Sequence, residues 1–93
     1  MVRTRIRPPV PNPFNPVTSV EFTLAARTHL ALRIYDVQGK LVRTLEDRTM
    51  AAGVHNAYWD GRDDRGTAAA SGVYFVRLVA GATVLTQKMV MIK

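Results

Sequence analysis

The sequence predicts an all-β protein, an antiparallel sandwich of about seven short strands. Apolar and polar residues alternate in several short segments, which is typical of half-buried strands. Turn signals rich in glycine and aspartate separate these segments about every ten residues, as in antiparallel sandwiches. No segment shows convincing helical periodicity, and there is no βαβ pattern and no internal repeat.

Residues 1–16 predict a lead-in to a domain that we place at residues 17–93. Pro11–Pro16 holds three prolines, which lack a backbone donor and have a fixed φ, so this segment fits neither a helix nor a central strand. Phe14 is its only large apolar side chain. We expect Phe14 to pack against the edge of the sandwich and to fix the direction of the lead-in. Apolar residues and arginines alternate over residues 2–6, which could form an edge strand.

The first half of the domain predicts three strands and a hairpin. Val20–Leu24 and Leu30–Tyr35 each alternate apolar residues with polar or small ones. Asp36–Lys40 is a predicted turn, in which Gly39 can take a positive φ. Leu41–Leu45 then returns as a third strand. We expect the following residues, 46–52, to form a loop.

The second half predicts three further strands, separated by polar or glycine-containing turns. Trp59 ends the first of them and falls on its apolar face, so we expect a core residue, although a tryptophan can also form a sugar-binding platform. Tyr74 comes two residues after Gly72, a placement that suits a tyrosine corner, in which the tyrosine hydroxyl bonds nearby backbone. We expect Tyr74 to form such a bond. The strands are 53–59, 73–79 and 83–92, and the connections are 60–66, 67–72 and 81–82.

Composition limits the function classes. The chain has 93 residues, 47% of them hydrophobic and 22% charged, which suits one small globular domain. It has no cysteine, hence no disulfide and no thiolate metal site. No apolar run approaches the ~20 residues that span a bilayer, and no signal peptide is predicted. The net charge of +6 is dispersed beyond Arg3, Arg5 and Arg7, so we expect no nucleic-acid partner and no membrane insertion.

Asp60, Asp63 and Asp64 are the weak candidates for a metal site. Three carboxylates and loop carbonyls could supply the oxygens that calcium prefers. Their spacing fits no EF-hand loop, and arginines lie among them. The favoured interpretation is that these aspartates cap the turns of a tight connection, so we expect no cofactor.

The sequence offers no convergent set of acid, base and nucleophile. His29 and His55 lack ligand-spaced partners, and neither of the two serines lies in a Gly-x-Ser-x-Gly elbow. The only two glutamates lie far apart, which gives thin support for paired-carboxylate hydrolysis. We therefore expect a protein that is not an enzyme.

The final strand is the main candidate for partner recognition. A last strand at a sheet edge presents unpaired backbone donors and acceptors, to which a partner can add a strand. The two terminal lysines could be read by a receptor or could prevent indiscriminate pairing. The candidate residues are Lys88, Met89, Val90, Met91, Ile92 and Lys93.

Several of these segments, in order, resemble a known family. Pro11–Pro16, Leu32–Leu45, Trp59–Gly66 and Ser71–Leu78 resemble the type A C-terminal sorting domain of type IX secretion cargo. They are also similar to the immunoglobulin-like domain of the flagellar hook-capping protein. The structural signature of the resemblance is Pro13, Phe14, Asn15, Pro16, Trp59, Gly72 and Tyr74.

The resemblance implies an immunoglobulin-like sandwich that outer-membrane secretion machinery recognises at the C-terminus of a larger protein. Such a parent would be secreted or held at the bacterial cell surface, after passing through the periplasm. Two alternatives remain open: a carbohydrate- or surface-binding accessory module, and a structural or assembly domain like that of the hook cap. The carbohydrate-binding alternative predicts that Tyr35, Tyr58 and Phe75 form one exposed patch.

Overall fold

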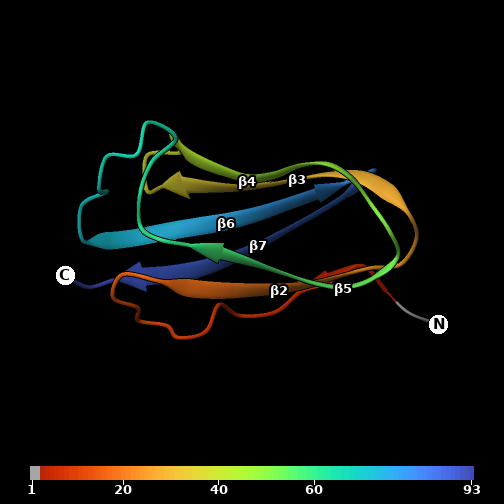
Figure 1. Cartoon of the computed structure of the whole chain (residues 1–93), viewed down its shortest axis with the longest axis horizontal. Helices are drawn as coiled ribbons and strands as arrows, with labels where there is room; N and C mark the ends of the chain where they lie inside the picture. Colours follow the sequence, from red (N-terminus) through yellow and green to blue (C-terminus); the bar gives the residue numbers. More distant parts are fainter. Residues whose placement is uncertain (1–2) are drawn as a thin grey trace.

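A computed structural model describes residues 3–93 and confirms the predicted all-β sandwich (Figure 1). Its strands form two antiparallel sheets, one of three strands in the order β1-β2-β5 and one of four in the order β4-β3-β6-β7. The strands are β1 (Arg5–Ile6), β2 (Thr18–Leu24), β3 (Thr28–Asp36), β4 (Leu41–Met50), β5 (Gly53–Trp59), β6 (Gly72–Ala80) and β7 (Thr83–Met91).

The core forms because alternate side chains of each strand point between the two sheets. From β3, Leu30, Leu32 and Ile34 are fully buried, and β6 contributes Val76 and Leu78 to the same layer. The other sheet supplies the apolar residues of β2 and the end of β5. The alternation in the sequence therefore identified the inward faces of β2, β3, β5 and β6 correctly.

The structure corrects one predicted element. Strand β4 continues to Met50, whereas residues 46–52 were expected to form a loop. Strand β4 lies at an edge of its sheet, pairs only with β3 and has no fully buried side chain. Its sequence therefore lacks the apolar alternation that reveals half-buried strands.

The lead-in contributes to the sandwich. Arg5 and Ile6 pair with β2 as strand β1, within the segment expected to form an edge strand; Val2 lies outside the described residues. Further along, Val10 pairs with Ser19, and Phe14 pairs in parallel with Met91 of β7. Ile6 and Phe14 belong to the core of the sandwich, although the boundary that we placed at residue 16 put both residues in the lead-in.

The two ends of the described chain lie at opposite ends of the sandwich (Figure 1). Strand β1 lies at the end where β7 begins, and Lys93 lies where β7 finishes. The lead-in, the connection between β5 and β6, and the end of β7 gather at that second end. No segment of residues 3–93 forms a helix with the length and apolarity that a bilayer crossing requires.

Candidate protein-binding surfaces

The terminal run Lys88–Lys93 divides into exposed and buried side chains. Met89 and Met91 are buried in the core, at 0% and 1% exposure. Lys88, Ile92 and Lys93 are exposed. The side chains of the two lysines and of Ile92 are therefore the most accessible to a partner, and Val90 is half-buried.

The backbone of the same run is not a free edge. The lead-in lies beside it, and Asn12 donates to the Lys88 carbonyl at 3.1 Å while accepting from the Val90 amide at 2.9 Å. Phe14 then donates to the Val90 carbonyl and accepts from the Ile92 amide, both at 2.9 Å. The prediction of unpaired backbone groups was wrong for this half of β7, because another segment of the chain already pairs with it.

Phe14, Trp59 and Tyr74 form an aromatic cluster beneath the end of β7. The ring centres of Phe14 and Trp59 lie 5.5 Å apart, and those of Trp59 and Tyr74 lie 5.0 Å apart in an edge-on arrangement. Phe14 is 2% exposed and Trp59 is fully buried. Phe14 packs as the sequence predicted, and Trp59 is a core residue that no sugar could contact.

The Tyr74 hydroxyl donates to the carbonyl of Ala70, four residues upstream, as expected of a tyrosine corner. Burial raises the pKa of this phenol above its ordinary value of 10.0, and the nearby Asp36 carboxylate raises the pKa further. Tyr74 therefore fixes the start of β6 through a neutral hydroxyl.

Gly61 explains why the Trp59-Asp60-Gly61 sequence suits this end of the sandwich. Its φ is +77°, a conformation that residues with a side chain rarely adopt. A Cβ built here would lie 2.8 Å from the Met91 sulfur and 3.2 Å from the Pro16 carbonyl oxygen. Gly61 therefore lets the end of the lead-in, the loop and the end of β7 approach one another closely.

The three candidate calcium ligands accept backbone hydrogen bonds, two of them as turn caps. Asp60 accepts from the Arg62 amide, and Asp63 accepts from the amides of Arg65 and Thr67. Asp64 reaches across to β4 and accepts from the Thr44 amide at 3.0 Å. The turn-capping interpretation is confirmed for Asp60 and Asp63, whereas Asp64 ties the connection to β4. Within residues 3–93, no group of three or more metal-ligating side chains lies close enough to hold an ion.

Each of the two histidines has a structural contact. His29 bonds the Asp47 carboxylate at 2.7 Å on the exposed face of the larger sheet. His55 stacks on Phe22 and bonds the Ala51 carbonyl at 2.8 Å, next to the turn between β4 and β5. Neither side chain meets a nucleophile or a second ligand in these contacts.

The exposed aromatic residues do not form the single patch that a carbohydrate-binding module predicts. Tyr35 of β3 and Phe75 of β6 are cross-strand neighbours in the four-stranded sheet. Tyr58, which is 67% exposed, belongs to β5 in the other sheet. Two aromatic side chains therefore share an outer face, and the third is separated from them by the core.

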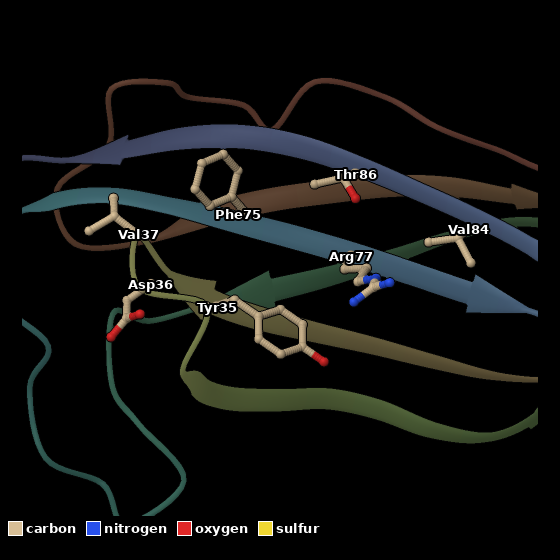
Figure 2. A pocket seen from close by; sticks show the side chains of 8 residues that line it. Tyr35, Asp36, Val37, Phe75, Arg77, Val84 and Thr86 are labelled. Carbon is tan, nitrogen blue, oxygen red and sulfur yellow. The ribbon is translucent and has the colours of Figure 1, made fainter.

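A shallow depression of about 330 Å³ lies on this outer face (Figure 2). We call it the outer groove; it is lined by Tyr35, Phe75, Arg77, Val84 and Thr86, with the 36–39 turn at one end. Tyr35 and Phe75 are half-buried although no other layer covers them. The groove thus combines aromatic surface with a cation and lies beside β7.

Arg77 and Asp36 are the two charged residues that line the outer groove, and two further cations, Arg33 and Lys88, lie beside it. Arg77 lies directly opposite Arg33 on β3, and Phe75 lies opposite Lys88 on β7. Arg33 pairs with Asp47 at 3.1 Å, but Arg77 and Lys88 have no carboxylate partner among residues 3–93. Tyr35 and Phe75 were singled out in the sequence as patch residues, but no pattern indicated the opposed arginines, because these residues are far apart in the chain and meet only once β3 and β6 pair.

The model of the FlgD Ig-like domain family matches residues 15–83. The chain belongs to this family. The basal-body rod modification protein FlgD of Salmonella typhimurium is 43% identical over 47 residues, which are 50% of this chain and 20% of that protein. The same protein of Salmonella typhi matches equally. The chain thus spans one fifth of the length of these curated relatives.

Solved structures show the same fold over nearly the whole chain. Dimeric latent PorU from Porphyromonas gingivalis has a TM-score of 0.76 at 20% identity, over 99% of this chain and 10% of PorU. PorZ, a surface component of the type IX secretion system of the same bacterium, has a TM-score of 0.62 at 23% identity, over 97% of this chain and 11% of PorZ. FlgD from P. aeruginosa has a TM-score of 0.65 at 19% identity, over 94% of this chain and 74% of that FlgD chain. The predicted immunoglobulin-like family is confirmed.

Proposed function

We propose that this domain is a non-enzymatic sorting or attachment module of a larger bacterial protein, recognised by outer-membrane secretion machinery. The parent protein would be secreted or held at the cell surface after crossing the periplasm. The partners are proteins: the secretion machinery at one end of the domain and the upstream part of the parent at the other.

The placement of the two chain ends carries this proposal. A parent protein attached upstream would join the sandwich near β1, at the opposite end from Lys93 (Figure 1). The exposed side chains of Lys88, Ile92 and Lys93 would then remain accessible to a receptor. The matches to PorU and PorZ, which are each about ten times longer than this chain, fit the same arrangement.

The chemistry of the described residues favours a docking role over catalysis. The loop aspartates accept backbone hydrogen bonds, the histidines contact structural groups, and Trp59 and Tyr74 belong to the core. Catalysis would need an acid, a base and a nucleophile that converge in one cleft. The side chains of this domain instead leave exposed cations and the outer groove, with its aromatic and charged lining, as its main chemical features.

Export of a reporter tests the proposal. Residues 1–93 would be fused behind a fluorescent protein that carries a signal peptide, in a bacterium with type IX secretion. We expect fluorescence at the cell surface or in the medium, and retention in a strain that lacks the secretion pore. Retention in the periplasm of both strains would contradict the proposal.

Matched variants of the same fusion locate the recognised residues. Replacing Lys88 and Lys93 by alanine should reduce export, whereas replacing Arg27 and Arg65 removes equal charge elsewhere and should not. Equal export of both double variants would exclude the terminal lysines as recognised groups.

A structural role in an assembly is the second candidate, and family membership favours it. The matched relatives include the basal-body rod modification protein of the flagellum. Here the domain would hold subunits together instead of addressing a cargo. This alternative predicts oligomers in solution and no effect of the fusion on export, so sedimentation of the isolated chain separates it from the sorting role.

A further inference from the structure

The two halves of β7 differ in what pairs with their outer edge. In an antiparallel ladder, successive residues direct their backbone groups alternately toward the two sides of the strand. Val90 directs both groups away from β6, toward the lead-in, and the register of β7 is regular from Thr83 to Met91. Val84 and Thr86 therefore direct their amides and carbonyls outward too, and no residue among 3–93 bonds them.

This open half of β7 borders the outer groove. Val84 and Thr86 form one wall, and Tyr35, Phe75 and Arg77 lie on the same face of the sheet (Figure 2). Val84 is 48% exposed, and the Thr86 side chain is exposed and short. A strand added beside Val84 and Thr86 would place alternate side chains on this face, where they could reach across Thr86 to Arg77.

The charge of the groove is unfavourable for the isolated domain. Like charges directly opposite each other in a sheet are destabilising, and Arg33 and Arg77 are so placed. Asp47 offsets Arg33 but is shared with His29, and it does not contact Arg77. A carboxylate bound over the groove would relieve this repulsion and would form a charge-assisted hydrogen bond with the Arg77 guanidinium.

We propose that the open half of β7 binds an extended acidic peptide segment of a partner protein. The peptide backbone would pair with Val84 and Thr86, and its glutamate or aspartate side chains would contact Arg77. Phe75, which neighbours Arg77 on the outer face of β6, would border this contact. This proposal goes beyond the sorting role, because the binding would occur whether or not the domain directs export.

Two features of the surface favour an acidic peptide over other occupants. Unpaired backbone donors and acceptors suit a partner that has a backbone of its own, which a sugar chain lacks. A second copy of this chain would also carry a net charge of +6, so overall repulsion between the copies opposes self-association. Opposite charge and an open edge together select an acidic extended segment.

Titration of the isotopically labelled chain with synthetic peptides, followed by NMR, tests the proposal. The probe is a short peptide of alternating glutamate and threonine with blocked ends, and its control replaces each glutamate by glutamine. We expect saturable shifts in the amides of Val84 and Thr86, affinity that falls with added salt, and roughly tenfold weaker binding of the control peptide.

Two variants identify the contacts. Arg77→Gln should weaken binding of the acidic peptide about tenfold, whereas Arg65→Gln, an exposed arginine outside the groove, should not. Thr86→Pro removes one outward amide without breaking a bond to β6, and should weaken the acidic and the neutral peptide alike. Melting curves establish that each variant is folded.

Several results would overturn the proposal. These are absence of saturable shifts at about 1 mM peptide, equal binding of the neutral peptide, or shifts centred on the other sheet. Equal affinity for a uronic-acid oligosaccharide would mean that the groove binds an acidic glycan and not a peptide. Sedimentation as a dimer that Arg77→Gln dissociates would mean that the groove binds a second copy of the chain. Failure of export with normal peptide binding would contradict only the sorting role.

Discussion

The two halves of β7 differ in what covers their outer edge. Its second half is covered on both sides: by β6 through the ladder and by the lead-in through Asn12 and Phe14. Its first half pairs with β6 alone and leaves the outward groups of Val84 and Thr86 without a partner. The covered half contributes stability, whereas the open half borders an unpaired cation and offers a surface for binding.

The difference follows from where the lead-in lies. Its backbone pairs with β7 only near the end where Met89 and Met91 are buried. Nearer the middle of β7, a side chain makes the contact, because Gln87 donates to the Ile6 carbonyl at 3.2 Å. At the other end, the chain turns away to pair with β2 as β1. Edge strands invite unwanted pairing, and this protein covers one half of its edge and flanks the other with positive charge.

Phe14→Ala gives the largest expected effect on the covered half. Removing a ring that is 2% exposed should lower the free energy of unfolding by about 3–5 kcal/mol. Urea unfolding measures the loss, and hydrogen exchange of the Val90 amide should accelerate more than that of the Thr86 amide. Tyr58→Ala, which truncates an exposed aromatic residue, is the control and should cost less than about 0.5 kcal/mol. A similar loss for both would show that Phe14 does not stabilise the covered half.

Gly61→Ala should come next, at about 2–3 kcal/mol. The new methyl group would meet the Met91 sulfur at 2.8 Å and would also strain a backbone with a φ of +77°. Gly66→Ala is a matched control, because Gly66 has a φ of +83° but open space around its Cβ position. It should cost only about 1 kcal/mol, from backbone strain. Equal losses in chemical unfolding would mean that the contact with Met91 has no energetic effect.

Tyr74→Phe should cost about 1–2 kcal/mol, because the Ala70 carbonyl loses its donor. The substitution should also change the pH dependence of stability. The raised pKa means that the folded state holds the phenol proton more tightly than the unfolded chain. This contribution is complete below pH 10.0 and is lost as the pH rises through the folded-state pKa. Melting temperatures at alkaline pH should therefore fall less steeply for Tyr74→Phe, and parallel curves would contradict the assignment.

Asn12→Ala should cost about 0.5–1 kcal/mol, because its exposed amide bonds the Lys88 carbonyl and the Val90 amide. Asn15→Ala is the control, since the Asn15 side chain is exposed and makes no such contact with β7. Thermal unfolding compares the two. If the control lost as much stability, the side-chain bonds of Asn12 would not be what holds the lead-in on β7.

Arg77→Gln should have the smallest effect on stability, a change of at most about 0.5 kcal/mol, and in the stabilising direction. The reason is that it removes one of two opposed arginines from the open half. Chemical unfolding at low salt measures it best, because salt screens the repulsion. A loss above 1 kcal/mol would mean that Arg77 serves the fold and would remove the contrast between the halves.

Some of the candidate surface could be predicted from residues alone. Trp59, Tyr74 and the aspartate caps were predicted because each role depends on nearby sequence: a strand end, a preceding glycine or a turn. Strand β4 was cut short because an edge strand with no buried face carries no apolar period. In the outer groove, Tyr35 and Phe75 were named as patch candidates, whereas Arg77 and Thr86 were missed because they come to lie beside them only once β3, β6 and β7 pair.

The sequence by itself determined the all-β class, the inward faces of the central strands and the burial of Phe14, because alternation and proline chemistry act over a few neighbouring residues. Only the tertiary structure decided which segment pairs with β7. The lead-in and β7 lie about 75 residues apart in the chain, as the bond between Asn12 and Lys88 shows with a separation of 76. No local pattern records a contact at that distance, because it depends on how the two sheets close around one core.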